Sequence, residues 1–458
     1  MSDNQFDLII VGAGAGGYVA AFRAVQSGLK VALIEKEKVG GICLNWGCVP
    51  SKSLQASAEL LERLKKAEDF GLSGVDFDKV KPDWETMLKR AQTLAGQFAS
   101  RTELKLTKSG VKLIKGEAKV LTPEKVLVDG IEYFTKDLVL ATGSNYTFPE
   151  FLNKVNERFY TPKSIYNLKE LPKTMTIIGG GVIGIEFASL FSSLGVKVNL
   201  VDHHFPLMPY MDHDLTEYLL EILRRKQIKL YCGFTATAFE DNKLKLEKVG
   251  NKTEVLSLDS EVYLSAIARQ GNVAGLEPLV SKGLEVHRGH VKTDLRCRTS
   301  LPHVYAVGDL NGRFMTAHVA AKEGLTAVET ILGNGEDIIY DFMPYNMYST
   351  PEFASVGLTE KEALHKGFLV STGKFSLSHN AKAQADGDGE GFIKIVFDKK
   401  TEEILGVHIA TKNATDLIGE AIVAMSSGMT IKQFASLTHP HPTLAEALVD
   451  ASFKGMGY

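Results

Sequence analysis

The feature that most constrains the fold is a glycine-rich motif that occurs twice. In the first copy, the apolar run Asp7–Val11 leads into three spaced glycines, a helix-like stretch and a second apolar run that ends at Glu35. The second copy begins at Met175–Ile178 and ends, after the same order of elements, at Asp202. The six glycines are Gly12, Gly14 and Gly17, followed much later by Gly179, Gly181 and Gly184. In both copies the acid follows the third glycine by eighteen positions, from 17 to 35 and from 184 to 202, which predicts two strand–helix–strand nucleotide units.

Each glycine position in this motif has a physical reason. The first glycine permits a tight turn, the second lets a pyrophosphate approach the backbone, and the third lets the helix pack on the strand. The acids Glu35 and Asp202 would each accept a hydrogen bond from a ribose hydroxyl. Ordinary turns that bind nothing are the alternative, and two copies in register argue against it. A carboxylate at Asp202 repels a 2′-phosphate, and His203 and His204 are not the arginines that NADP requires, so NAD is predicted there.

Length and composition exclude several classes of protein. The 458 residues suggest about three domains of ~150 residues. Hydrophobic residues make up 44% and charged residues 23%, which is typical of a folded globular enzyme. The net charge of −3 predicts no nucleic-acid partner and no attraction to an anionic membrane, and no apolar run approaches the ~20 residues of a membrane span. Only Met1 to Gln5 precede the first strand, too few for a signal or transit peptide, so we expect a cytoplasmic protein unless a presequence has been removed.

Residues 53–140, which lie between the two motifs, combine helices and short strands. Residues 53–101 have a largely helical pattern, with apolar residues such as Leu60, Leu61 and Leu64 on one face. Residues 111–140 have the pattern of short strands and turns, and Asp129-Gly130 predicts a tight hairpin turn between two of them.

The segment Gly40–Lys52 carries the most informative chemistry, with Cys43 and Cys48 five positions apart. No second close cysteine pair completes a zinc site, so no metal is expected. In a regular helix five residues rise about 7.5 Å, too far for a disulfide, so the segment must be distorted, and Gly47 allows this. Cys48 would start the following helix, whose dipole favours a thiolate, with Lys52 on the same face.

Structural thiols are the alternative for each cysteine. For Cys232 and Cys297, which are isolated in the sequence, we favour that interpretation. For Cys43 and Cys48 we favour redox chemistry, because two close cysteines in a chain without a disulfide framework are typical of it.

The run Gly-Gly-Ile-Cys-Leu-Asn-Trp-Gly-Cys-Val-Pro-Ser-Lys at 40–52, following the first glycine motif, resembles the pyridine nucleotide–disulfide oxidoreductases of the glutathione reductase type. The resemblance covers essentially the whole chain and is greatest to the members that oxidise dihydrolipoamide. It implies an α/β fold with two Rossmann-like dinucleotide-binding domains, for FAD and NAD, and a C-terminal α+β dimerisation domain. The expected division is 1–148 and 267–341 for the FAD domain, 149–266 for the NAD domain and 342–458 for dimerisation.

The resemblance also implies roles for individual residues. Lys52 would lie beside the flavin and pair with Glu186, Asp309 would hold the ribityl chain, and Ala268-Arg269 would lie near the nicotinamide nucleotide, where the family usually has Gly-Arg. The other positions expected to contact a cofactor are Gly116, Ala118, Thr142, Gly143, Ser144, Met315, Ala317 and His318.

The loop from Thr438 to Glu446 contains two histidines next to prolines. Such residues are usually ordinary surface residues, and the sequence alone favours that interpretation. The resemblance reverses it: His441 would be the catalytic base and Glu446 its carboxylate partner, with His439 the weaker candidate. In the family this loop reaches the cysteines of the other subunit, so a homodimer is expected.

The expected function is the oxidation of protein-bound dihydrolipoamide to lipoamide with NAD+, through a Cys43–Cys48 disulfide and FAD. The expected partners are the lipoyl-bearing acyltransferase and other subunits of 2-oxo acid dehydrogenase complexes. The alternative is an NADPH-dependent disulfide reductase of the glutathione reductase type. Four residues argue against it: Leu44, Asn45, Ser51 and Asp202. A mercuric-ion reductase would need cysteines near the C-terminus, which Ala451–Tyr458 lack, and a non-catalytic scaffold with flavin as structure is a further alternative.

Overall fold

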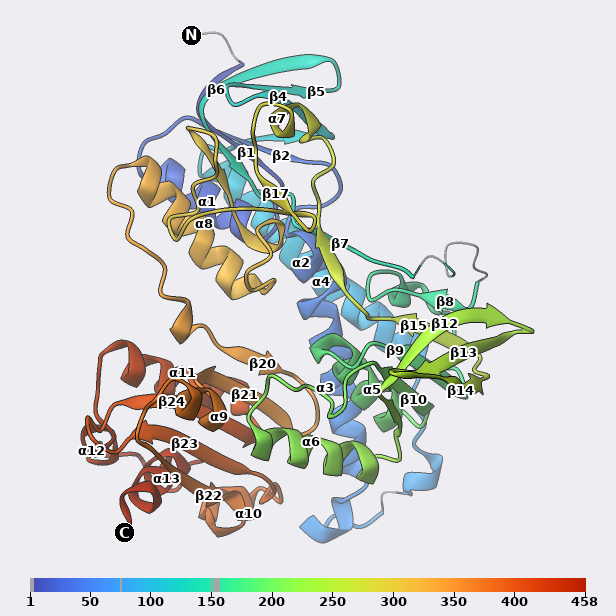
Figure 1. Ribbon diagram of the computed structural model, residues 1–458. Coiled ribbons are helices and arrows are strands. Elements are labelled where there is room, and N and C mark those ends of the chain that lie inside the picture. The colour runs from blue at the N-terminus through green and yellow to red at the C-terminus, as the bar shows by residue number, and fades with distance from the viewer. Residues whose placement is uncertain (1–3, 75, 150, 152–156) are drawn as a thin grey trace.

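The computed structural model describes residues 4–458 except 75, 150 and 152–156. The first glycine motif lies in a sheet at one end of the molecule, and the second motif and the C-terminal third form two further sheets at the other end (Figure 1). The expected α/β class with a separate C-terminal α+β part is confirmed.

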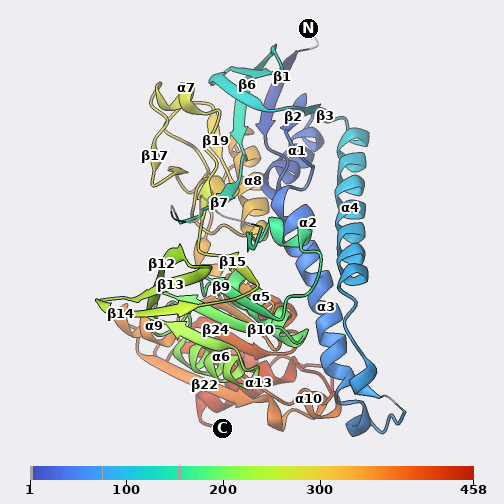
Figure 2. The ribbon, with the colours of Figure 1, turned by 90° about the vertical axis from the view of Figure 1, so that its right-hand side faces the viewer.

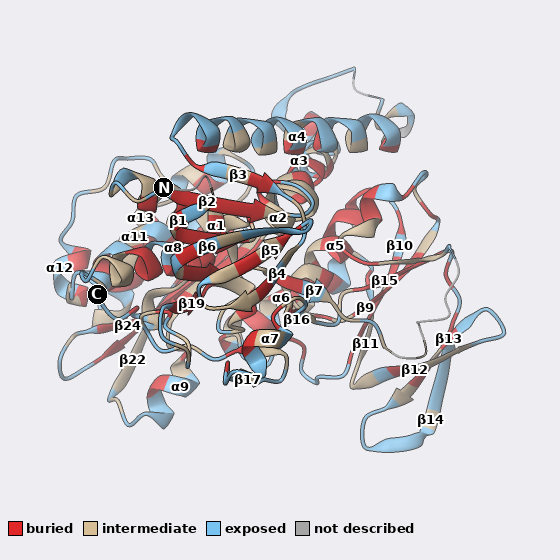
Figure 3. Ribbon diagram, turned by 90° about the horizontal axis from the view of Figure 1, so that it is seen from above, coloured by how far each residue is buried: buried red, intermediate tan, exposed pale blue. Residues whose placement is uncertain are grey.

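The first sheet is built around the first glycine motif. Its strand order is β3-β2-β1-β6-β5-β4, with β19 beside β6, and β1 pairs in parallel with both β2 and β6. The strands are β1 (Gln5–Val11), β2 (Val31–Glu35), β3 (Lys112–Lys115), β4 (Ala118–Thr122), β5 (Lys125–Val128), β6 (Ile131–Leu140) and β19 (Val304–Ala306). The central strands are buried on both faces, which explains their nearly unbroken apolar sequences (Figure 3).

Helices cover one face of this sheet. Apolar residues of α1 (Ala15–Gln26), α4 (Trp84–Lys108) and α8 (Ala317–Ile331) share one core with β1 and β2. The predicted hairpin turn is confirmed, because Asp129 and Gly130 both have positive φ, 47° and 81°, between β5 and β6.

The second sheet is built in the same way around the second motif. Its order is β11-β10-β9-β15-β8, all parallel, and a separate antiparallel sheet, β12-β13-β14, packs beside it. The elements are β8 (Phe159–Tyr160), β9 (Thr174–Ile178), α5 (Val182–Ser193), β10 (Lys197–Asp202), α6 (His213–Arg225), β11 (Lys229–Cys232), β12 (Phe234–Glu240), β13 (Lys243–Lys248), β14 (Asn251–Leu258) and β15 (Val262–Ser265).

Two long helices run along one side of the molecule (Figure 2). Helix α3 (Cys48–Leu64) follows the short α2 (Gly41–Trp46), and its residues Leu54 and Ala58 belong to the core that contains α5. The helical pattern predicted for 53–101 is interrupted between α3 and α4, where only short 3-10 turns occur in the described residues. The remaining short elements are η1 (Ala67–Phe70), η2 (Phe77–Lys79), β7 (Ser144–Tyr146), η4 (Ser164–Asn167), β16 (Arg269–Gly271), α7 (Glu277–Val280), β17 (Val286–His287), β18 (His290–Val291), η5 (Gly308–Leu310), η6 (Tyr340–Phe342) and η7 (Leu377–His379).

The C-terminal third is an antiparallel sheet with helices packed on it. The strand order is β20-β21-β24-β23-β22, and β23 and β24 are buried along their whole length. The elements are β20 (Tyr345–Met347), β21 (Glu352–Gly357), α9 (Glu360–His365), β22 (Val370–Ser376), α10 (Ala381–Ala385), β23 (Phe392–Asp398), β24 (Ile404–Thr411), α11 (Ala414–Ser426), α12 (Ile431–Ala435) and α13 (Glu446–Met456).

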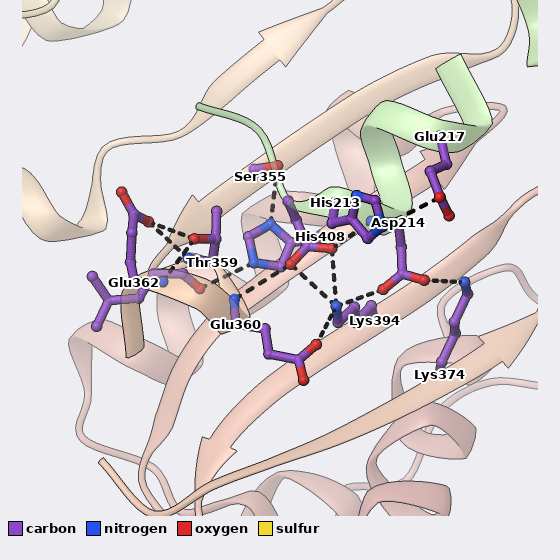
Figure 4. A network of polar contacts seen from close by, with 12 residues as sticks. His213, Asp214, Glu217, Ser355, Thr359, Glu360, Glu362, Lys374, Lys394 and His408 are labelled. Atoms are coloured by element: carbon purple, nitrogen blue, oxygen red, sulfur yellow. Dashed lines mark hydrogen bonds and ion pairs between the residues drawn. The ribbon is translucent and has the colours of Figure 1, made fainter. Parts of the chain in front are cut away.

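A buried ion cluster joins this third to the second nucleotide unit (Figure 4). The Lys394 side chain, only 3% exposed, lies 3.0 Å from Asp212 and 2.5 Å from Asp214 at the start of α6, and 2.7 Å from Glu360. Burial alone would lower the pKa of Lys394, but hydrogen bonds to these three carboxylates raise it overall. The charge is therefore held, and it fixes α6 against the C-terminal sheet. None of the helices in the described part of the chain is both long and apolar enough to cross a membrane.

Candidate active site

The two glycine loops have nearly the same geometry. The first glycines, Gly12 and Gly179, have φ of 102° and 107°, which a residue with a side chain rarely adopts. A Cβ on Gly17 would lie 1.9 Å from the Gly12 carbonyl oxygen, and one on Gly184 would lie 1.8 Å from that of Gly179. The third glycine therefore allows the helix to pack against the turn, as predicted.

The middle glycines face open space. Gly14 and Gly181 each precede the first residue of a helix, α1 and α5, and neither has an atom within 4 Å of the position of an added Cβ. No side chain caps either of these described helix starts, so their backbone N–H groups are available to a phosphate.

The two acids lie beside the loops, as their spacing predicts. Glu35, at the end of β2, accepts hydrogen bonds from the backbone N–H groups of Ala13 and Glu37, both at 2.8 Å. Asp202, at the end of β10, accepts from Gly180 at 2.6 Å and from His204 at 2.7 Å. These bonds orient each carboxylate next to its own glycine turn.

Two of the positions expected to contact a cofactor, Gly116 and Ala118, follow β3, whose Lys115 pairs with Glu35. Gly116 has a φ of 148° and donates its N–H to the Glu35 carbonyl at 3.0 Å. Ala118, two residues on, begins β4.

The 141–144 turn packs against the first glycine loop. A Cβ on Gly12 would lie 2.2 Å from the Ala141 carbonyl oxygen. Thr142 donates its hydroxyl to the Asn272 carbonyl at 2.6 Å, and Gly143 has a φ of 71°. Ser144 donates to the Asp309 carboxylate at 2.6 Å, which joins this turn to the residue predicted to hold the ribityl chain of the flavin.

Asp309 has a cationic partner in this structure. Arg269 lies 2.5 Å from it and also donates to the Met315 carbonyl at 2.6 Å. Arg269, which the resemblance places near the nicotinamide nucleotide together with Ala268, therefore contacts the predicted flavin segment here. Ala268 accepts a hydrogen bond from the Thr147 N–H at 3.0 Å.

The N-terminus of α8 begins at Ala317, directly after Met315 and Thr316. His318 donates from Nε2 to the Pro344 carbonyl at 3.1 Å, and burial lowers the pKa of this histidine. The N-terminus of α8 adds the partial positive charge of its backbone N–H groups to this region, next to the Arg269 guanidinium.

Cys43 and Cys48, the predicted redox pair, lie side by side. Helix α2 ends at Trp46, Gly47 adopts a non-helical φ and ψ of −129° and −113°, and Cys48 begins α3. The Cys43 and Cys48 sulfur atoms are 2.6 Å apart, and both are free thiols in this structure. The helix is therefore broken at Gly47, as the disulfide geometry requires.

The pKa values of the two thiols are shifted in opposite directions. A hydrogen bond from Cys43 lowers the pKa of Cys48 to about 7 against the opposing effect of burial, and the charge of Lys52 contributes to the lowering. The same hydrogen bond and burial raise the pKa of Cys43. The thiolate is therefore favoured on Cys48, at the N-terminus of α3.

Lys52 is held beside the cysteines by two contacts, with Glu186 and with the Tyr348 ring. Its Nζ atom lies 2.7 Å from the Glu186 carboxylate, whose side chain is 12% exposed, and 4.2 Å from the centre of the Tyr348 ring. Glu186 also accepts the Tyr348 backbone N–H at 2.8 Å. The predicted Lys52–Glu186 pair is present, and Tyr348, from the start of the C-terminal sheet, completes it.

His441 and Glu446 form the predicted pair. The His441 Nδ1 atom lies 2.8 Å from Glu446, the first residue of α13, and 73% of its side chain is exposed. A hydrogen bond from the Thr443 N–H, followed by that from His441, lowers the pKa of Glu446, so this carboxylate stays charged. His439 pairs instead with Glu420, and its side chain is only 9% exposed.

The exposed His441 precedes helix α13 in the chain. Helix α13 lies at the end of the molecule away from α2 in both side views (Figures 1 and 2). Among the described residues, no hydrogen bond or ion pair of His441 reaches Cys43 or Cys48.

Sequence comparisons place this architecture in a known family. Residues 6–324 match the pyridine nucleotide-disulphide oxidoreductases, and residues 343–452 match the dimerisation domain of the same family. The chain belongs to the pyridine nucleotide-disulfide oxidoreductase family, as the cysteine motif indicated. Enzymes of this family use FAD and NAD(P).

Individual relatives are similar over the full chain. Dihydrolipoyl dehydrogenase of Chlorobaculum tepidum is 35% identical, with 99% of this chain and 97% of the relative covered. Dihydrolipoyl dehydrogenase of Bacillus subtilis is also 35% identical, with 99% and 98% covered. The crystal structure of LpdA from Mycobacterium tuberculosis has a TM-score of 0.89 at 25% identity and covers 98% of this chain and 99% of its own. The flavoprotein disulfide reductase RclA from Escherichia coli, in a Cu(II) complex, shares the fold with a TM-score of 0.87 at 24% identity, with 98% and 99% covered.

The residues present fit FAD. The open face of Gly14, the uncapped start of α1, Glu35 and Asp309 together offer hydrogen-bond donors for a pyrophosphate and acceptors for hydroxyl groups. Gly181, α5 and Asp202 offer the same set for a pyridine nucleotide.

Two residues of this region were not predicted. Tyr348 contacts Lys52 from a strand end almost three hundred residues further along the chain. Glu323, on α8 and 1% exposed, accepts the Gly308 N–H at 2.6 Å and the Tyr340 hydroxyl at 2.7 Å, and so fixes the loop before Asp309. The sequence signal that could have identified Glu323 is an acidic residue among the mostly apolar positions of a helix.

Proposed function

We propose that this chain is a dihydrolipoyl dehydrogenase, which oxidises protein-bound dihydrolipoamide to lipoamide with NAD+. The observation that carries the proposal is the Cys43–Cys48 pair at the broken helix, with the Lys52–Glu186 pair behind it. Relatives with this name align with almost the whole chain.

The proposed reaction begins with the disulfide form of the pair. A thiol of dihydrolipoamide attacks the Cys43 sulfur, the Cys43–Cys48 bond breaks, and Cys48 leaves as a thiolate. His441 of a second subunit, oriented by Glu446, accepts the proton of the attacking thiol. The second substrate thiol then attacks the substrate sulfur bound to Cys43. The mixed disulfide breaks, lipoamide is released, and Cys43 leaves as a thiolate that takes up the proton of the second thiol, so both cysteines are reduced.

The geometry suits these roles. Cys48 is suited to leave as a thiolate because it begins α3 and lies near the charge of Lys52, and both effects remain when Cys43 carries the substrate sulfur. Glu446 holds Nδ1 of His441, so Nε2 is free to take the substrate proton. FAD, when bound, would supply the electron-transfer chemistry between this dithiol and NAD+.

We also propose domain boundaries at 148, 266 and 341. The cofactor-contact residues named above are part of the same proposal. So are NAD rather than NADP at Asp202, a cytoplasmic location, a homodimer, and docking to the lipoyl-bearing acyltransferase of 2-oxo acid dehydrogenase complexes. The dimerisation domain in the C-terminal third supports the dimer.

Replacing Cys48 tests the proposal. Cys48→Ser should reduce NAD+ reduction by dihydrolipoamide at least about a thousandfold, because the disulfide can no longer form. The matched control is Cys232→Ser, a cysteine outside the pair, which should retain turnover within about twofold. Turnover of Cys48→Ser near the parent rate would overturn the scheme. Glutathione with NADP+ as the preferred couple of the parent enzyme would favour the NADPH-dependent reductase instead.

A further inference from the structure

The turn after β10 places two histidines next to the acid of the second glycine loop. Asp202 is buried, whereas the side chains of His203 and His204 are 60% and 44% exposed. The same turn after β2 has Lys36 and Glu37 in place of the histidines. The histidines therefore distinguish the second nucleotide unit from the first.

Both imidazoles present a nitrogen to the same carboxylate oxygen. The Nδ1 atom of His204 lies 2.9 Å from Asp202 Oδ1, and that of His203 lies 3.8 Å from it. One ligand atom from each of the three residues lies within 4.8 Å of the other two. Within the part of the chain that the structure describes, this is the one group of three metal-ligating side chains so arranged.

We propose that Asp202, His203 and His204 bind a divalent transition-metal cation of the zinc type. Two imidazole nitrogens and one carboxylate oxygen are a ligand set that such cations prefer, and three protein ligands leave a fourth position for water. The carboxylate is already oriented by the backbone N–H groups of Gly180 and His204, as the supporting contacts of metal ligands commonly are. The exposed histidines give a cation direct access from solvent.

The cation excludes the pyridine nucleotide. This step rests on the proposed function, in which Asp202 accepts a hydrogen bond from the nucleotide ribose. A cation held by Asp202 Oδ1 and by the two exposed rings would occupy the solvent side of this buried carboxylate, from which the ribose has to approach. The cation therefore acts as a competitive regulator of nucleotide binding, and the nucleotide weakens cation binding by the same factor.

Zinc chloride and the oxidised FAD-bound enzyme provide the test. In this form Cys43 and Cys48 are joined and do not ligate zinc. Zinc per chain is measured by equilibrium dialysis and mass spectrometry, and the Kd of NAD+ by calorimetry. We expect the double variant His203→Gln/His204→Gln to bind one zinc ion fewer per chain than the parent. At a zinc concentration ten times its own Kd, the Kd of NAD+ should rise about tenfold in the parent and stay constant in the double variant.

Two matched controls locate the effect. His213→Gln removes another exposed histidine with an acidic neighbour, Glu217, on the same unit, and it should keep both the zinc ion and the tenfold shift. Cys43→Ser/Cys48→Ser removes the thiols and should also keep both. Each variant is compared with its own Kd for NAD+ without zinc.

The outcomes separate this inference from the proposed function. Equal zinc binding by the parent and the double variant would overturn the site. Zinc that binds at the histidines without shifting the Kd of NAD+ would overturn the competition. If, in that case, Asp202→Asn also leaves the Kd of NAD+ unchanged, the role of Asp202 in nucleotide binding is what fails, and the metal site stands.

Discussion

The two glycine loops are alike in backbone and different in what surrounds them. Their first glycines differ in φ by only 5°, 102° against 107°, and both helices begin without a side-chain cap. The first loop, however, touches the redox segment: Gly40 donates its N–H to the Ala13 carbonyl at 2.8 Å, and a Cβ on Gly41 would lie 2.9 Å from Gly14 Cα.

The second loop packs against a different neighbour. A Cβ on Gly180 would lie 2.3 Å from the Leu207 side chain and 2.9 Å from that of Asp202. Leu207 follows the exposed turn that carries His203 and His204. The comparison shows that close packing of glycines fixes both loops in the same way, whereas the first loop contacts the segment of the two cysteines and the second lies beside an exposed turn.

The largest expected effect separates packing from ligand approach within one loop. Gly184→Ala places a Cβ 1.8 Å from the Gly179 carbonyl oxygen, so the turn must move, whereas Gly181→Ala meets no atom within 4 Å. We expect Gly184→Ala to destabilise its unit by about 1–3 kcal/mol or more and to lower NAD+ turnover at least about a hundredfold. Gly181→Ala should keep the parent unfolding free energy and weaken only NAD+ binding. Equal unfolding midpoints of the two variants in urea would contradict this.

The next effect tests whether the two acids have separate cofactors. Asp202→Asn should raise the Kd of NAD+ about tenfold and leave FAD content unchanged, because one charge-assisted hydrogen bond is weakened. Glu35→Gln should lower FAD retention and leave the Kd of NAD+ unchanged. Calorimetry measures the first quantity, and flavin absorbance per chain after gel filtration measures the second. A loss of flavin in Asp202→Asn would mean that the two loops do not act independently.

The comparison also shows what the sequence could predict. The loops, the acids at the strand ends and the break at Gly47 follow from short-range geometry, because glycines and cysteines at fixed spacing permit few backbone conformations. The His441–Glu446 pair came from the family resemblance, since a histidine next to a proline has no local signal. Contacts between distant segments could not be predicted, because neither Lys394 on β23 nor Tyr348 has a periodic pattern that identifies its partner.

The turn after β10 holds an arrangement that its sequence does not predict. In the sequence, His203 and His204 are informative only as residues that are not arginines. The structure directs a nitrogen of each ring to Asp202, which two adjacent letters in a sequence do not reveal.

A smaller effect concerns the sulfur pair beside the first loop. In the reduced protein, thiolate absorbance should rise as the pH increases through about 7, because the pKa of Cys48 is lowered to about 7 while that of Cys43 is raised. Below that pH both sulfurs are protonated, and above it Cys48 is charged. Ultraviolet absorbance of the reduced parent minus that of Cys48→Ser measures the transition, with Cys232→Ser as control. Lys52→Gln should move the midpoint upward, because a positive charge that stabilises the thiolate is lost. A midpoint that stays in place would exclude Lys52 as a contributor.

The smallest effect concerns the residue directly after each acid. Lys36 follows Glu35 and pairs with Glu117 at 2.9 Å, but the two side chains are 44% and 70% exposed. Solvent and salt screen such a pair, so Lys36→Gln should leave the urea unfolding midpoint equal to that of the parent. Flavin content should equal that of the parent, because the Glu35 carboxylate is oriented by Ala13 and Glu37 N–H groups and not by Lys36. Urea unfolding followed by tryptophan fluorescence measures the first quantity and flavin absorbance the second. A loss of flavin in Lys36→Gln would show that the side chain after Glu35 also affects cofactor binding. The two loops would then differ less than their surroundings suggest.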